Sequence, residues 1–236
     1  MTQAQAVADE AEKERLLDYL RSTRAALVGK LDGLSEYEVR RPRTPTGTNL
    51  LGIVKHLAGV EIGYFGSTFG RPFPDPPAWL DDAVFDADPN ADLWVRPEES
   101  REEIVGLYQR AWAHADATVA ALPLSALGRV PHWPAERARV TLHHILVHVL
   151  ADTARHAGHA DILRETVDGV AGLRESGDNM PSTDAAFWAA HVARVEAAAN
   201  AAETARPHLI TGSARKAATS GRMRTEPVIT GGGVGD

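Results

Sequence analysis

Hydrophobic residues recur every three or four positions through most of this chain, which is the spacing of helices with one apolar face. In the first such segment, Leu16, Leu20, Leu27 and Leu31 share a face. No segment shows the alternation of period two that indicates a strand. The pattern predicts an all-α protein, an up-and-down four-helix bundle with an additional C-terminal helix. The predicted helices cover residues 12–33, 50–66, 98–122, 142–167 and 183–204.

Polar residues and glycines mark where these helices begin and weaken. Asn49 or Thr48 can cap the second helix, and Thr141 can cap the fourth, because each carries a side-chain oxygen for the first free amides. Gly158 is expected to break the fourth helix. Glycines also weaken the second helix by roughly 1 kcal/mol each relative to alanine, and their density indicates close packing or room for something beside the helix. They stand at positions 52, 59, 63 and 66.

The connections between helices are rich in proline and glycine, which favours loops over 40–49, 71–97 and 123–139. The second of these holds six prolines together with aromatic residues. We expect it to be an ordered lid or binding loop. Residues 8–204 are predicted to form the bundle domain, and the weakly periodic segment 205–236 a flexible C-terminal tail.

The composition of the chain excludes several classes of function. The 236 residues carry a formal charge of −7, which argues against non-specific nucleic-acid binding. Cysteine is absent, which excludes a disulfide framework, a cysteine-ligated zinc and a cysteine nucleophile. No stretch approaches the roughly 20 apolar residues that span a bilayer. The first residues lack the apolar core of a secretion signal, so we expect a cytoplasmic protein without a membrane partner.

Histidines are concentrated in the fourth predicted helix, where five of the ten fall within seventeen residues. Such a cluster suggests metal binding or proton transfer. Each step of four residues rotates a helix by about 40°, so adjacent members of a series at this spacing can hold one ion together. The third ligand must come from elsewhere: His56 in the second helix is the natural candidate, and His114 the alternative. The series consists of His144, His148, Asp152 and His156.

A packed core histidine is the ordinary alternative for a single histidine on an apolar helix. The clustering of histidines on this helix, with a carboxylate among them, makes a packed core histidine a less favoured interpretation here. A buried aspartate is costly unless it is paired or binds a cation. Asp152 is therefore explained more economically by a metal.

Two segments carry a family resemblance. NLLGIVKHLAGVE, followed about a hundred residues later by HVLADTARHAGHADILRE, resembles the DinB-like superfamily of helical-bundle metal proteins. The segments TPTGTNLLG, FGRPFP and RHAGHADI are similar to its actinobacterial mycothiol S-transferase-like branch. The resemblance implies that His56, Asp152 and His156 are the metal ligands. Asp152 departs from the histidine or glutamate usual at its position, and its stem is one methylene shorter than that of glutamate.

The resemblance also implies an activity. Two histidines and one carboxylate suit a borderline divalent ion, Zn²⁺ or Ni²⁺ above all. The open coordination positions would take mycothiol or a similar low-molecular-weight thiol as cosubstrate. Metal binding lowers the pKa of a thiol, so its thiolate can attack a small electrophile. We therefore expect a metal-dependent thiol S-transferase.

Other residues are weaker candidates. His148 is a candidate for supporting the ligands or shuttling a proton, and Arg155 for binding a carboxylate of the thiol or substrate. His159 is near enough to affect the same pocket. Trp79 and Trp94 either line the mouth of the site or anchor the proline-rich loop to the bundle.

Two other functions stay open at this point. One is a hydrolase in which the same ion activates water and no thiol is needed. The other is a non-catalytic, stress-related metal-binding bundle, with a homodimer formed through an exposed helix face as a further option. A closed pocket around His56, or an Asp152 that points away from it, would favour the non-catalytic alternative.

Overall fold

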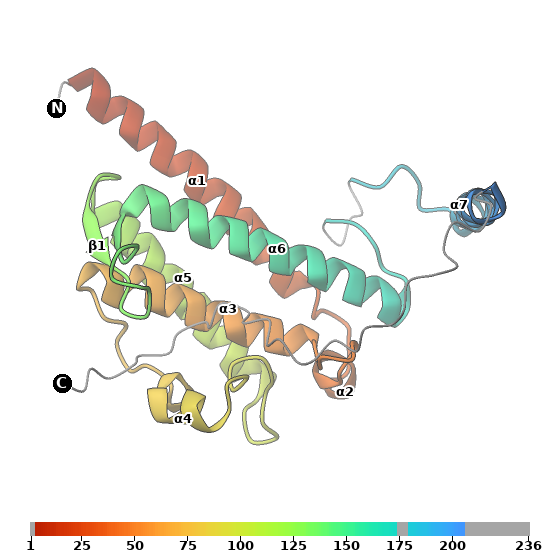
Figure 1. Ribbon diagram of the computed structural model, residues 1–236, viewed down its shortest axis with the longest axis horizontal. Coiled ribbons are helices and arrows are strands. Elements are labelled where there is room, and N and C mark those ends of the chain that lie inside the picture. Colours follow the sequence, from red (N-terminus) through yellow and green to blue (C-terminus); the bar gives the residue numbers. More distant parts are fainter. Residues whose placement is uncertain (1–2, 174–178, 206–236) are drawn as a thin grey trace, which may run out of the picture.

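Four long helices pack around one hydrophobic core. The computed structural model describes residues 3–173 and 179–205. Helix α1 packs against α5 and α6, and α3 packs against the same two helices, so the four close into a bundle (Figure 1). The all-α bundle prediction is confirmed. The four helices are α1 (Gln3–Gly29), α3 (Leu50–Phe65), α5 (Arg101–Ala121) and α6 (Leu142–Asp168).

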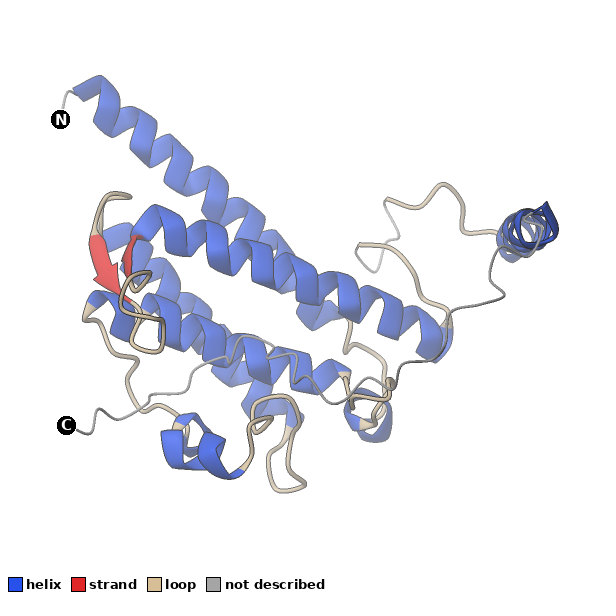
Figure 2. Ribbon diagram, viewed as in Figure 1, coloured by secondary structure: helices blue, strands red, loops and turns tan. Residues whose placement is uncertain are grey.

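Short elements occupy the connections, and one pair of them corrects the sequence analysis. Strand β1 (Leu127–Arg129) pairs antiparallel with β2 (Arg139–Thr141), with Gly128 opposite Val140. Figure 2 shows this small sheet beside the start of α6. The prediction of no strand was wrong because three residues are too few to show an alternating pattern. The remaining short elements are α2 (Glu36–Arg40), η1 (Ser67–Phe69), η2 (Ala78–Leu80) and α4 (Asp82–Ala87).

The helix caps follow the sequence. The Asn49 side chain accepts a hydrogen bond from the Gly52 amide at 2.7 Å, and the Thr141 hydroxyl accepts one from the His144 amide at 3.1 Å. Both predicted caps are thereby confirmed. Helix α6 runs through Gly158 without a break, contrary to expectation. A single glycine costs only about 1 kcal/mol in a helix, less than the packing of a long helix contributes.

One connection departs from strict up-and-down order, because α3 and α5 run in the same direction. Lys55, near the start of α3, binds Glu99, which lies just before α5. At the other end, Thr68 after α3 lies against Gly128 after α5. The long proline-rich connection therefore returns along the whole length of α3 before α5 begins (Figure 1).

That connection is anchored to the bundle by aromatic side chains. Trp79 is buried, and its ring lies against Gly59 of α3 and 4.9 Å from the Lys55 ammonium. Phe85 is also buried. Trp94 is 42% exposed, and its indole N–H donates to Asp88 at 2.9 Å. For Trp79, the structure favours anchoring over lining a mouth.

The core contains a buried ion pair that joins three helices. Arg24 of α1 donates to both carboxylate oxygens of Glu61 of α3 at 2.7 and 2.6 Å. It also donates to Asp116 of α5 at 2.8 Å. Arg24 and Glu61 are both essentially inaccessible to solvent. Complete burial raises the pKa of Glu61 to about 7, although the Arg24 guanidinium acts in the opposite direction.

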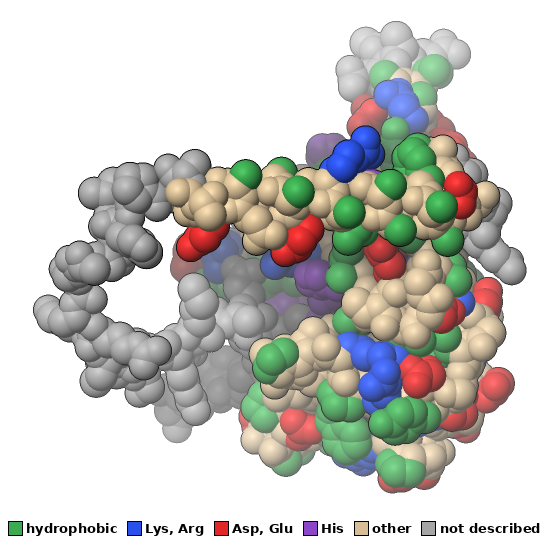
Figure 3. Space-filling view, turned by 90° about the vertical axis from the view of Figure 1, so that its right-hand side faces the viewer, with side chains coloured by type: hydrophobic (Ala, Val, Ile, Leu, Met, Phe, Trp, Pro, Cys, Tyr) green, Lys and Arg blue, Asp and Glu red, His purple; other side chains and the backbone are tan. Residues whose placement is uncertain are grey.

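Helix α7 (Ala185–Ala205) confirms the additional C-terminal helix and lies apart from the core. Figure 3 shows it crossing in front of the bundle with hydrophobic side chains along its length. Among them, Val192 and Val195 are more than half exposed. The tail predicted for residues 205–236 lies outside the described residues except for Ala205. None of the helices in the described part of the chain is both long and apolar enough to cross a bilayer.

Candidate metal centre

Three of the candidate ligands meet between α3 and α6. His56 of α3 and Asp152 and His156 of α6 each offer a ligand atom, and these atoms lie within 4.8 Å of one another. The two imidazole rings are 4.7 Å apart between centroids. Atoms bound to one tetrahedral ion at about 2 Å lie roughly 3.3 Å apart, so small side-chain movements would complete a shared shell.

Helix geometry explains how the sequence builds this group. Asp152 and His156 are four residues apart and so share one face of α6. His56 is in the middle of α3, and only 4% of its surface is exposed. The side chains of Asp152 and His156 are 30% and 20% exposed. The group therefore lies at the edge of the core, where solvent or a small molecule can reach the α6 pair.

The electrostatics of His156 suit a metal ligand. Burial lowers its pKa to about 4, and the neighbouring His56 shifts it in the same direction. The ring is therefore neutral near pH 7, which is the form that binds metals. Its Nδ1 is buried without a hydrogen-bond partner among the described residues. Its Nε2 lies 3.6 Å from Asp152, longer than a normal hydrogen bond. A divalent ion would satisfy a lone pair that the protein leaves unsatisfied.

One residue of the site was missed by the sequence analysis. Nδ1 of His56 lies 2.7 Å from Oδ2 of Asp92, and both side chains are about 5% exposed or less. Asp92 belongs to the proline-rich connection between α4 and α5. Nothing in the residue pattern distinguishes it from the other acidic residues of that loop, because its burial depends on how the loop docks.

His148 lies further along the same pair of helices, in an aromatic group. Its ring packs against Tyr64 and Trp133, with centroids 4.8 and 5.2 Å away. The Trp133 indole donates to the Tyr64 hydroxyl at 3.1 Å, and the His132 ring packs edge-on against Tyr64, with centroids 5.6 Å apart. Eight residues, or about 12 Å of helix rise, separate His148 from His156.

The remaining candidates take separate positions. His114 of α5 packs against Phe73, with ring centroids 5.4 Å apart, and is not part of the group of three. His144 lies against Trp133. His159 is exposed, with its ring 5.4 Å from that of His156. Arg155 is exposed, and its charge helps to lower the pKa of His156.

Fold and site together define a class: an all-α bundle with a candidate metal site between two of its helices. A family model described as mycothiol S-transferase matches residues 15–169, well over half of the chain. The chain belongs to this family, and the resemblance seen in the sequence is confirmed. No curated protein matches it. The matched region contains α3, α6, the three candidate ligands and Asp92.

Proposed function

We propose that this chain is a divalent-metal-dependent thiol S-transferase that joins mycothiol, or a similar low-molecular-weight thiol, to a small electrophile. The observation that carries the proposal is the convergence of His56, Asp152 and His156 in a member of the mycothiol S-transferase family. Three protein ligands leave coordination positions open, which is typical of catalytic rather than structural sites.

The ligand set favours Zn²⁺ or Ni²⁺, since imidazole nitrogen suits both and the single carboxylate supplies an oxygen. A bound divalent ion lowers the pKa of a coordinated thiol, so the thiolate exists near neutral pH. The sulfur would form a bond to the electrophilic carbon, and solvent would take the thiol proton. An alkyl halide would lose its halide with the electron pair, an epoxide would open at its C–O bond, and an activated alkene would gain a proton from solvent at the neighbouring carbon. Burial keeps His156 neutral for this role, and partial exposure of Asp152 leaves the site accessible.

Two further residues receive roles within this proposal. Exposed Arg155, which precedes His156 in the sequence, is our candidate for binding a carboxylate of the thiol or of the electrophile. His148 is one helical turn before Asp152 and is our candidate for a proton shuttle. Its ring packs within the aromatic group, against Tyr64 and Trp133.

The metal is tested first, by elemental analysis of wild-type protein and three alanine variants. We expect about one divalent ion per chain in wild type. We expect it to be lost in Asp152→Ala and His156→Ala while helicity is retained. His159→Ala is the matched control, because its ring touches His156 but is outside the group of three. A wild-type protein that binds no divalent ion would refute the proposal.

Activity is tested next with mycothiol and a panel of alkyl halides, epoxides and activated alkenes. We expect conjugates only when both metal and thiol are present. Metal-dependent turnover without thiol would replace the transferase by a hydrolase. Stoichiometric metal without any turnover would favour the non-catalytic bundle. That alternative has the weaker geometric support, because Asp152 lies with His56 rather than pointing away from it.

A further inference from the structure

A carboxylate from the connection between α4 and α5 is buried against an imidazole of α3. We propose that Asp92 is a positioning residue, which fixes the ring orientation and tautomer of His56, and that residues 88–99, here called the strap, hold it in place. The inference rests on the proposed function only for its effect on metal affinity. The tautomer of His56 is a property of the metal-free protein.

The contact defines which nitrogen of His56 is free. A carboxylate only accepts hydrogen bonds, so the 2.7 Å contact places the proton on Nδ1 of His56. Nε2, on the opposite side of the ring, then carries the lone pair. A ligand histidine whose other nitrogen donates to a carboxylate is held in one tautomer and one orientation. Asp92 thus selects Nε2 as the atom offered to the ion.

Gly52 allows the strap to come this close. A Cβ atom at Gly52 would lie 2.0 Å from the Leu93 carbonyl oxygen, so only glycine fits there. The same carbonyl accepts a hydrogen bond from the Asn49 side chain at 3.1 Å. Gly52 is one turn before His56, and Leu93 directly follows Asp92. Docking of the Leu93 carbonyl on α3 therefore brings the Asp92 carboxylate to the level of His56.

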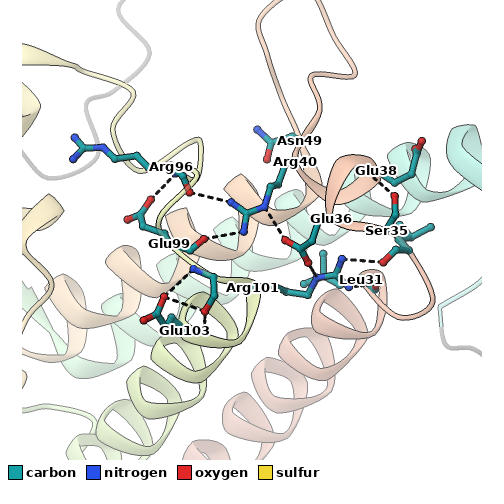
Figure 4. A network of polar contacts seen from close by, with 12 residues as sticks. Leu31, Ser35, Glu36, Glu38, Arg40, Asn49, Arg96, Glu99, Arg101 and Glu103 are labelled. Atoms are coloured by element: carbon teal, nitrogen blue, oxygen red, sulfur yellow. Dashed lines mark hydrogen bonds and ion pairs between the residues drawn. The ribbon is translucent and has the colours of Figure 1, made fainter.

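Two cationic side chains, buried Lys55 and half-buried Arg40, fix the rest of the strap. The Lys55 ammonium donates to the Trp94 carbonyl at 3.1 Å and to the Glu99 carboxylate at 3.0 Å. Arg40 of α2 donates to the carbonyls of Arg96 and Glu99 at 3.0 and 2.8 Å (Figure 4). These contacts tie the strap to α2 and α3 on the C-terminal side of Asp92. The carboxylate is thus held by the backbone that carries it, without any bound ligand.

A purely structural Asp92 would stabilise the fold without setting the tautomer, so the test reads the tautomer. Long-range nitrogen–proton NMR spectra of metal-free protein report which nitrogen of His56 carries the proton. We expect the Nδ1–H form in wild type and loss of its predominance in Asp92→Ala. Asp88→Ala is the matched control, since Asp88 belongs to the strap and accepts from the Trp94 indole rather than from His56. It should keep the wild-type tautomer.

Metal affinity, measured by competition with a chelator, provides the second readout. Loss of such a carboxylate typically weakens metal binding 10–100-fold, and we expect that range for Asp92→Ala. Gly52→Ala should reproduce the effect by displacing the strap. Gly106→Ala on α5 is its control, because a Cβ there would meet only the flexible end of Arg110. Both controls should stay within about threefold of wild type.

The outcomes separate this inference from the proposed function. A wild-type protein without metal affinity refutes the proposed function, while the tautomer measurement still decides the role of Asp92. Should Asp92→Ala fail to fold, Asp92→Leu keeps a similar side-chain volume and removes every atom that could accept a hydrogen bond from His56. A predominant Nδ1–H form in every folded Asp92 variant would overturn the inference, and so would unchanged affinity in the Asp92 variants of a metal-binding protein.

Discussion

Removing the Glu61 carboxylate is expected to destabilise the bundle severely. Glu61→Ala would leave the Arg24 guanidinium buried, with two of its three short hydrogen bonds lost. The third, to Asp116 at 2.8 Å, would remain. Water cannot replace the lost partners easily, because only 1% of the Arg24 side chain is accessible.

The magnitude follows from the cost of an unpaired buried charge. Breaking a buried ion pair by removing one partner costs about 3–5 kcal/mol. We expect about 3 kcal/mol, the lower end, since Asp116 still accepts one hydrogen bond. Burial raises the pKa of Glu61 to about 7, against the attraction of Arg24. Replacing a buried ion pair by apolar residues of similar size is often nearly neutral, so the double variant Arg24→Met, Glu61→Leu should lie within about 1 kcal/mol of wild type.

Urea unfolding followed by far-ultraviolet circular dichroism measures these differences. Glu14→Ala is the control, because Glu14 is an exposed partner of Arg21 and should change the unfolding free energy by less than about 1 kcal/mol. The reasoning is refuted if Glu61→Ala costs under about 1 kcal/mol. It also fails if the double variant is as unstable as the single one.

Three further predictions concern pH, capping and the metal. Glu61 has its ordinary pKa of 4.5 in the unfolded chain and a pKa of about 7 in the folded protein, so the folded state binds its proton more tightly. Raising the pH from about 4.5 to about 7 should therefore lower the unfolding free energy of wild type by about 3 kcal/mol relative to that of Glu61→Gln. A difference between the two proteins that does not change with pH in urea titrations would contradict this. Asn49→Ala should cost at least about 1–2 kcal/mol in the same assay, because it removes the cap of α3. Asn49→Asp keeps the cap oxygen but loses the donor to the Leu93 carbonyl, so it should recover only part of that cost. A chelator should lower the melting temperature of metal-loaded wild type. At a free metal concentration a hundred times the dissociation constant, the bound metal adds about 3 kcal/mol to the unfolding free energy, and the chelator removes this contribution. The melting temperature of Asp152→Ala should not change.

The parts of the fold that could be predicted are those determined by local sequence. Asn49 and Thr141 capped the expected helices because a cap depends on residues three positions apart. Asp152 and His156 were placed together for the same reason, as neighbours on one helix face. His56 was assigned from its place in an apolar helix and from the family resemblance, and the structure brings it to the α6 pair.

Features that depend on contacts distant in sequence could not be predicted. The parallel course of α3 and α5 follows from where the long connection docks, which no periodicity reports. Arg24 and Glu61 are 37 residues apart, and each alone resembles an ordinary charged residue on a helix. Asp92 was missed for the same reason, since 36 residues separate it from His56. The glycines of α3 indicated that something packs closely against this helix, but not what it is. At Gly52 the missing side chain makes room for the strap.

The two halves of the candidate site therefore depend on different parts of the fold. Asp152 and His156 are oriented by the spacing of a single helix, so they keep their relation wherever α6 is formed. His56 is oriented by a carboxylate on the strap, which in turn depends on Gly52, Lys55 and Arg40. Substitutions in the strap should disturb one ligand of three and leave the α6 pair intact. Partial metal affinity in such variants, rather than complete loss, would follow from this division.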